Sequence, residues 1–189
     1  MVALMWAEEV VDLVGQFHLD RYGIEPRDLD RLIGIVTAPF LHAGFGHLVS
    51  NTLPFLVLGF LVALGGALRL IVVTVIVAVV GGLGTWLFAP PDSIHIGASG
   101  VVFGYAGYLL SRGFFTRRIR DFVLAAVILA IWGGALLTSL MPAAGISWQG
   151  HLFGALGGLA AGRVLARPPD RGGAIVDPRG RTPLLRAQR

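Results

Sequence analysis

Residues 70–89 read LIVVTVIVAVVGGLGTWLFA, a stretch without a single charged side chain. Arg69 precedes it, and Pro90 and Pro91 follow it directly. Charge and proline are expected at the ends of an apolar helix. An α-helix needs about 20 predominantly apolar residues to cross the hydrocarbon core of a bilayer. The stretch therefore predicts a membrane-spanning helix and sets the class of the fold.

Similar apolar runs recur on both sides of this stretch. Four of them predict further spans, at residues 48–68, 97–110, 122–140 and 148–166. The run at 97–110 is short, so we expect it to begin below the membrane surface. Residues 1–19 contain Glu8, Glu9 and Asp12 and predict a shorter, more polar sixth span, with an interfacial amphipathic helix as the alternative. A cleaved signal peptide does not explain runs that continue along the chain.

The composition agrees with an all-α, polytopic membrane helix bundle. Apolar residues make up 55% of the chain, the mean hydropathy is +0.76, and 14% of residues are charged, against about 25% in soluble domains. The absence of cysteine excludes disulfides, thiolate metal sites and cysteine nucleophiles. All 15 basic residues are arginine, which excludes a Ser-Lys dyad. The net charge of +4 does not indicate nucleic-acid binding, because the arginines cluster beside apolar runs.

The arginine clusters predict the topology. They follow alternate spans, and this side of the membrane is expected to be cytoplasmic. With six spans, both termini are cytoplasmic in the plasma membrane, and residues 1–167 form one membrane domain. Residues 168–189 are rich in Pro, Gly and Arg and predict a disordered basic cytoplasmic tail.

Polar side chains lie near the outer ends of three predicted spans. His42, His47 and Asn51 surround the start of the first clear span, Ser99 opens the short span, and His151 lies near the start of the last one. His47 and Asn51 are four positions apart and share a helix face. The topology, which uses only charges, places all five on the outer side of the membrane.

These residue types suit nucleophilic catalysis. A serine hydroxyl attacks once a base, usually histidine, takes its proton, and Asn and His side chains can donate hydrogen bonds to an oxyanion. Ser99 is therefore a candidate nucleophile, His151 its base, and His47 and Asn51 candidate oxyanion donors. Asp92 lies in a loop after two prolines, so we expect a dyad without an acidic third member.

Glycines at every fourth position would allow two of these helices to pack closely. They are Gly150, Gly154, Gly158 and Gly162 on the last span, and Gly100 and Gly104 on the Ser99 span. Small residues at this spacing let helix backbones approach, which would bring Ser99 and His151 within hydrogen-bond reach. Each feature alone has an ordinary structural explanation, and only the combination is specific. His18 and His95 are assigned to loops or interfaces, without a role.

Three segments together resemble the rhomboid family of intramembrane serine proteases. APFLH at 38–42 with HLVSN at 47–51 resembles the entry to the second helix of that family. GASGVVFG at 97–104 resembles its nucleophile motif, and GHLFG at 150–154 resembles its sixth-helix histidine motif. The resemblance covers residues 38–162 and implies a six-helix core.

The resemblance implies a serine endopeptidase that cuts transmembrane helices of other proteins near the outer surface, without metal or cofactor. It implies that Ser99 forms an acyl-enzyme and that His151 acts as base and then as acid. His47, Asn51 and the backbone N–H of Ser99 would bind the oxyanion. The segments 122–140 and 141–147 would form a gate and a cap. Supporting roles would fall to His42, Gly97, Gly100 and Phe103.

The chain departs from the family pattern at several positions, including Phe103, and two alternatives stay open. Many bacterial members have tyrosine where this chain has Phe103, which can stack on the histidine but lacks the hydroxyl. The first alternative is a non-catalytic membrane protein that binds client helices, against which the intact Ser99 and His151 argue. The second is a small transporter or channel, which would require charged residues or broken helices near mid-membrane that the clear spans lack.

Overall fold

A computed structural model describes residues 1–166 of the chain. Within that range the chain forms seven α-helices and two short 3-10 helices, with no β-strand, which confirms the all-α class. One isolated antiparallel bridge joins Ile24 to His95. The tail predicted at 168–189 lies outside the described residues.

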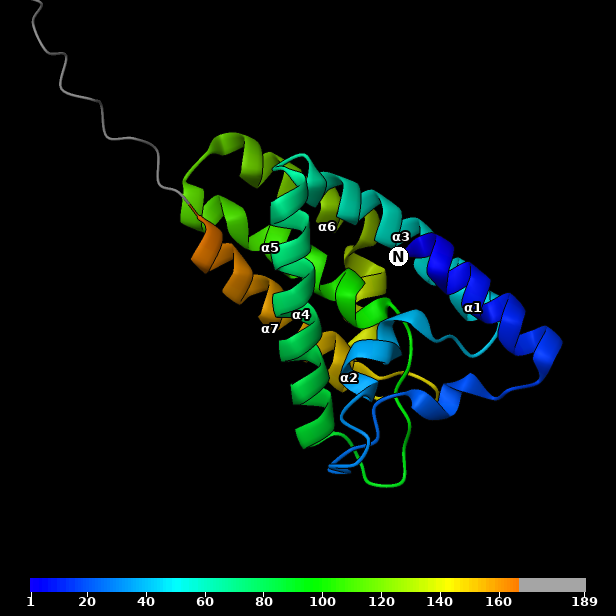
Figure 1. The fold of residues 1–189 in the computed structure, drawn as a ribbon. Coiled ribbons are helices and arrows are strands. Elements are labelled where there is room, and N and C mark those ends of the chain that lie inside the picture. Colours follow the sequence, from blue (N-terminus) through cyan, green and yellow to red (C-terminus); the bar gives the residue numbers. More distant parts are fainter. Residues whose placement is uncertain (167–189) are drawn as a thin grey trace, which may run out of the picture.

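Five long helices form the body of the molecule (Figure 1). They are α3 (Phe45–Ala63), α4 (Ala67–Phe88), α5 (Ser99–Thr116), α6 (Ile119–Ser139) and α7 (Trp148–Leu165). The N-terminal helix α1 (Val2–Gly15) packs along α3, and the short helix α2 (Gly34–Thr37) packs against α4. The 3-10 helices η1 (Leu19–Tyr22) and η2 (Ala38–Phe40) belong to the segment that joins α1 to α3.

Three of these helices, α3, α4 and α6, are long and apolar enough to cross a membrane. The helices α5 and α7 match predicted spans but carry the glycines and the polar candidate site residues. Helix α1 has 14 residues and is about 21 Å long at 1.5 Å per residue, less than the roughly 30 Å of a bilayer core. The expected helix at 1–19 is too long, because Gln16 turns left-handed (φ 50°) after Gly15. The count of six spans stays a prediction.

Two helices do not end where the sequence predicted. In both cases the prediction used an arginine as the helix stop. The first clear span does not continue to Arg69: α3 ends at Ala63, Gly66 adopts φ +108°, and Arg69 lies in the first turn of α4. The Ser99 span does not stop before Arg112. Helix α5 continues to Thr116, because Arg112 pairs with the buried carboxylate of Asp121 at 3.5 Å.

Helix α5 lies at the centre and packs against α3, α4, α6 and α7. Its contact with α7 uses the glycine faces, as predicted. A Cβ at Gly154 would collide with the backbone carbonyl of Gly100, and a Cβ at Gly158 with that of Gly104. The two backbones therefore touch directly, without side chains between them.

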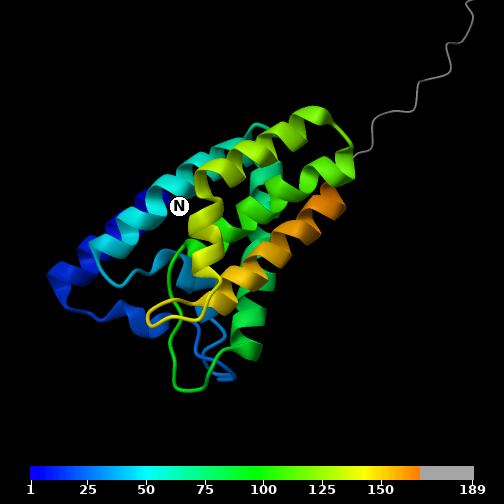
Figure 2. The same cartoon turned by 180° about the vertical axis from the view of Figure 1, so that it is seen from behind.

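The loops that precede three of the helices gather at one end of the bundle. Seen from behind in Figure 2, the segments 16–44, 89–98 and 140–147 lie together at this end. These segments lead into α3, α5 and α7. The starts of the three helices that carry the predicted site residues are therefore neighbours.

Candidate active site

Ser99 and His151 meet where α5 and α7 begin. Ser99 is the first residue of α5, and His151 lies in the first turn of α7. The Oγ atom of Ser99 is 2.9 Å from Nε2 of His151, within hydrogen-bond range. Beside this pair, a Cβ at Gly100 would lie 3.3 Å from the carbonyl oxygen of Gly150. Glycine at position 100 thus allows the approach that the pair requires.

The backbone of α6 holds the second ring nitrogen of His151. Its Nδ1 atom is 2.7 Å from the carbonyl oxygen of Ser139, the last residue of α6. The last carbonyls of a helix have no partner within it, so this oxygen is free to accept. Because a carbonyl can only accept, Nδ1 of the neutral ring carries the proton, and the lone pair of Nε2 faces Ser99. In Ser-His-Asp triads a carboxylate plays this orienting part.

Phe103 fixes the plane of the His151 ring. It lies one helical turn after Ser99, and its ring stacks on the imidazole with centroids 4.2 Å apart and an interplanar angle of 6°. A face-to-face neighbour at this distance leaves the imidazole little room to rotate about its side-chain bonds. The stack and the Ser139 carbonyl together define the orientation of the ring.

His47 lies against the chain just before Ser99. A Cβ at Gly97 would be only 2.7 Å from Cε1 of the His47 ring, and Gly97 has φ +112°, so glycine is required on both counts. Nδ1 of His47 accepts a 3.4 Å hydrogen bond from the N–H of Ala43, which leaves Nε2 as the donor. Asn51 donates from Nδ2 to the carbonyl of His47 at 2.9 Å and keeps a second amide hydrogen free.

His42 orders the loop that leads into Ser99. Its side chain is buried, with the residue only 2% exposed. Nδ1 is 3.2 Å from the carbonyl of Phe40, and Nε2 accepts from the N–H of Ala98 at 3.4 Å. Burial first, and then the neighbouring His47, lower the pKa of His42 to about 4. The ring is neutral at pH 7, which its acceptor role requires.

A cavity of about 980 Å³ connects the candidate residues. Ser99, His151, His47 and Asn51 all line it, and it continues between α3 and α6 along Pro54, Leu58, Trp132 and Leu136. Helix α6 packs mainly against α5 and leaves this side open. The volume lies at the upper end of the range for ligand clefts.

Sequence reasoning missed two parts of this site. The Ser139 carbonyl is a backbone group, so no residue type indicates it. His95, expected to have no role, lines the cavity and bonds to Ser147; the only signal for it was that it lies just before the serine motif. Among residues 1–166, no group of three or more His, Asp or Glu side chains is arranged to hold a metal ion.

Comparison with known proteins agrees with the fold and the motifs. The model of the Rhomboid domain matches residues 29–168. "Uncharacterized protein Rv1337" of Mycobacterium tuberculosis is 43% identical over 184 residues, which cover 92% of this chain and 76% of the relative. "Uncharacterized protein ML1171" of Mycobacterium leprae is 42% identical over 98% of this chain and 76% of its own length. "Putative rhomboid protease YdcA" of Bacillus subtilis is 30% identical over 72% of this chain and 69% of its own.

The chain belongs to the rhomboid family. The family match covers most of its length, and the three apolar helices agree with a multi-pass membrane protein that acts in a bilayer.

Proposed function

We propose that this chain is an intramembrane serine endopeptidase that cleaves transmembrane segments of other membrane proteins through Ser99 and His151. The observation that supports this most directly is one hydrogen-bonded series. It runs from the carbonyl of Ser139 through both ring nitrogens of His151 to the hydroxyl of Ser99. This series leaves the base in the tautomer that can accept the serine proton.

The proposed reaction proceeds through an acyl-enzyme. As Oγ of Ser99 attacks the peptide carbonyl, its proton passes to Nε2 of His151. The tetrahedral intermediate then expels the amine, which receives this proton from His151. A water molecule attacks the acyl-enzyme next, His151 takes a proton from it, and the same nitrogen returns a proton to Ser99 as the carboxylic acid leaves.

The oxyanion would be stabilised by three donors. The N–H of Ser99 is at the start of α5, where the first N–H groups have no partner within the helix. The Nε2–H of His47 and the free amide hydrogen of Asn51 approach from α3. Losing one donor of this kind costs roughly 100- to 1,000-fold in rate in a serine protease. His42 and Gly97 would support the site through the loop before Ser99.

The cavity between α3 and α6 suggests how a helical substrate enters. A transmembrane segment could approach Ser99 sideways from the bilayer if α6 and the cap loop 141–147 moved. We infer that residues 1–167 form one protease domain in the plasma membrane, with both termini cytoplasmic and the site facing outward. Substrates would be helices that unwind near the outer surface.

Labelling with a fluorophosphonate, followed by mass spectrometry, tests the proposal. The purified protein should become modified at Ser99, and both Ser99→Ala and His151→Ala should abolish the label. Ser111→Ala is a matched control, because Ser111 is a buried serine of the same helix whose hydroxyl bonds the carbonyl of Tyr108. A folded wild type that neither labels nor cleaves any model transmembrane substrate would overturn the proposal and favour the non-catalytic alternative.

A further inference from the structure

A second histidine–serine pair lies next to Ser99 and His151. Nδ1 of His95 is 2.7 Å from Oγ of Ser147. His95 precedes Ser99 by four positions, and Ser147 precedes His151 by the same number, so both hydrogen bonds join residues 52 positions apart. The segments 95–99 and 147–151 are thus connected at both ends.

Three further hydrogen bonds fix His95 in the loop before Ser99. Its backbone N–H and carbonyl exchange 2.9 Å hydrogen bonds with Ile24. Its Nε2 atom is 2.9 Å from Oγ of Ser93, whose own hydrogen is donated to the carbonyl of Pro90 at 2.6 Å. Ser93 must then accept from Nε2–H, which leaves Nδ1 of His95 as the acceptor for the Ser147 hydroxyl. Burial lowers the pKa of His95, which favours this neutral form.

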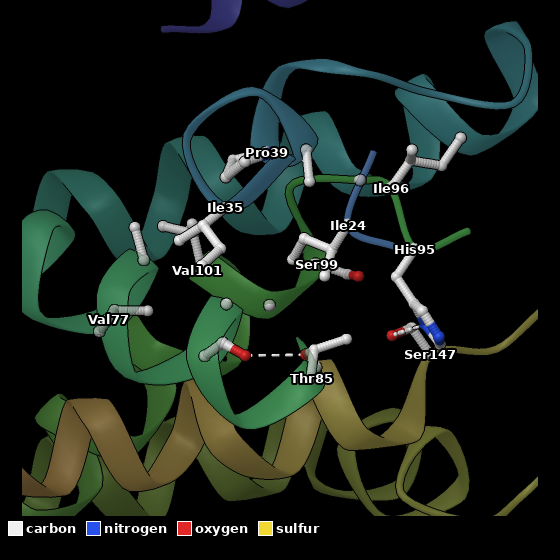
Figure 3. A pocket seen from close by; sticks show the side chains of 17 residues that line it. Ile24, Ile35, Pro39, Val77, Thr85, His95, Ile96, Ser99, Val101 and Ser147 are labelled. Atoms are coloured by element: carbon white, nitrogen blue, oxygen red, sulfur yellow. Dashed lines mark hydrogen bonds between the residues drawn. The ribbon is translucent and has the colours of Figure 1, made fainter. Parts of the chain in front are cut away.

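Ser147 connects the His95 side chain to the first turn of α7. It is the N-cap residue of α7, and its carbonyl accepts the N–H of His151 at 3.1 Å. A serine N-cap usually turns its hydroxyl to an N–H of its own helix. Here the hydroxyl makes no such bond and is directed to His95 instead. Figure 3 shows the two side chains pointing toward one another at a small cavity of about 40 Å³ that Ser99 also lines.

We propose that His95 and Ser147 form a latch that holds His151 in register with Ser99 while the cap loop moves. Ser147 ends that loop as the N-cap of α7, and Gly145, two positions before it, has φ +74°. The latch anchors the start of α7 to the chain that carries Ser99. Movement of residues 141–146 then stops at Ser147. The latch rests on the proposed function, and both residues are positioning residues that act through His151.

The rate of fluorophosphonate labelling at Ser99 tests whether the His95–Ser147 latch supports the reactivity of Ser99. His95→Ala and Ser147→Ala should each label about tenfold more slowly, since a lost hydrogen bond and a misplaced base both lower the rate. The double variant should be no slower than either single variant, because both remove the same interaction. With a model transmembrane substrate, kcat should fall and KM should stay the same.

Conservative variants separate positioning from folding. His95→Asn keeps an amide where Nδ1 was, and His95→Gln keeps one where Nε2 was. Asn should therefore restore most of the rate and Gln much less. Ser111→Ala, a buried serine of α5 that bonds only the carbonyl of Tyr108, is the control and should change the rate by less than about twofold. The unfolding temperatures of His95→Asn and His95→Gln should be similar, because each variant keeps one of the two side-chain hydrogen bonds of His95.

Each other outcome has a defined meaning. A wild type that labels while His95→Ala and Ser147→Ala label equally fast would overturn the latch and leave the protease proposal standing. A wild type that does not label would overturn both. If His95→Ala fails to fold, the comparison of His95→Asn with His95→Gln decides, and equal rates for these two would reject the latch.

Discussion

Three histidines of the site each have one ring nitrogen engaged by a backbone group. His151 faces the carbonyl of Ser139, His42 that of Phe40, and His47 the N–H of Ala43. In a neutral imidazole, the role of one nitrogen determines the role of the other. The backbone thereby makes His151 and His42 acceptors and His47 a donor toward the region of Ser99.

The buried, neutral His42 should make stability depend on pH. Its pKa is about 4 in the folded protein against a reference of 6.5, so the unfolded chain binds protons more readily as pH falls. Lowering the pH from 7 to 5 should therefore remove about 2 kcal/mol of the free energy of unfolding through this residue alone. Denaturation in detergent at both pH values should show a smaller pH effect in His42→Asn than in the wild type. Equal effects would contradict the assignment.

The stacked ring of Phe103 should support the reactivity of Ser99 by holding the His151 imidazole in place. Phe103→Ala removes the partner stacked 4.2 Å from His151 and should slow labelling of Ser99 about tenfold, because the imidazole gains freedom to rotate. Phe103→Tyr keeps the ring, and Phe103 borders the large cavity, so the hydroxyl has room and the rate should stay near that of the wild type. A slow Phe103→Tyr variant together with a fast Phe103→Ala variant would exclude stacking as the reason.

At the scale of helices, the contact between α5 and α7 sets the distance between the catalytic candidates. Gly158→Ala would push a methyl group into the carbonyl of Gly104 and should lower the free energy of unfolding by about 1–3 kcal/mol. Gly134→Ala on α6 is the matched control, because a Cβ there meets nothing within 4 Å. It should be neutral or raise stability by up to about 1 kcal/mol. Similar melting temperatures for the two variants would refute direct backbone packing.

The sequence predicted which segments form the five long helices better than it predicted where they end. Apolar runs locate the helices because their residues must avoid water. The helix ends depend on other features: the positive φ of Gly66 after α3, and the Arg112–Asp121 pair, which keeps α5 helical past a charged residue. A charged side chain indicates a helix end when it is solvated by water, but not when it pairs with another side chain. Which of the two applies is known only from the folded structure.

At the scale of the whole molecule, the loops that lead into the site gather at one end of the bundle. The α5–α6 turn, which contains arginines, lies at the opposite end. The chain has no cysteine, so single cysteines can report this arrangement in cells. Met141→Cys, in the cap, should react with a membrane-impermeant maleimide in intact cells. Arg118→Cys, in the exposed α5–α6 turn, should react only after permeabilisation. The reverse labelling pattern would contradict the proposed topology and indicate the opposite orientation in the membrane.

The sequence allowed us to predict that four side chains gather, namely Ser99, His151, His47 and Asn51. Charge bias places each helix start on one side of the membrane, and the glycine faces indicate which two helices pack together. The latch was not predictable. The sequence shows that His95 precedes Ser99, and Ser147 precedes His151, by the same number of positions. This spacing becomes informative only once Ser99 and His151 are known to face each other. Side-chain patterns also cannot reveal contributions from the backbone.

The Ser139 carbonyl has a consequence for how this chain can vary. Any amino acid at position 139 supplies the same oxygen, so a scan of substitutions would score Ser139 as dispensable although its backbone orients His151. A change of length has the opposite effect. One residue inserted into or deleted from α6 turns its end by about 100° and carries the oxygen away from the imidazole. This part of the site is therefore tolerant of point mutation and intolerant of insertion or deletion, even at positions far from Ser99.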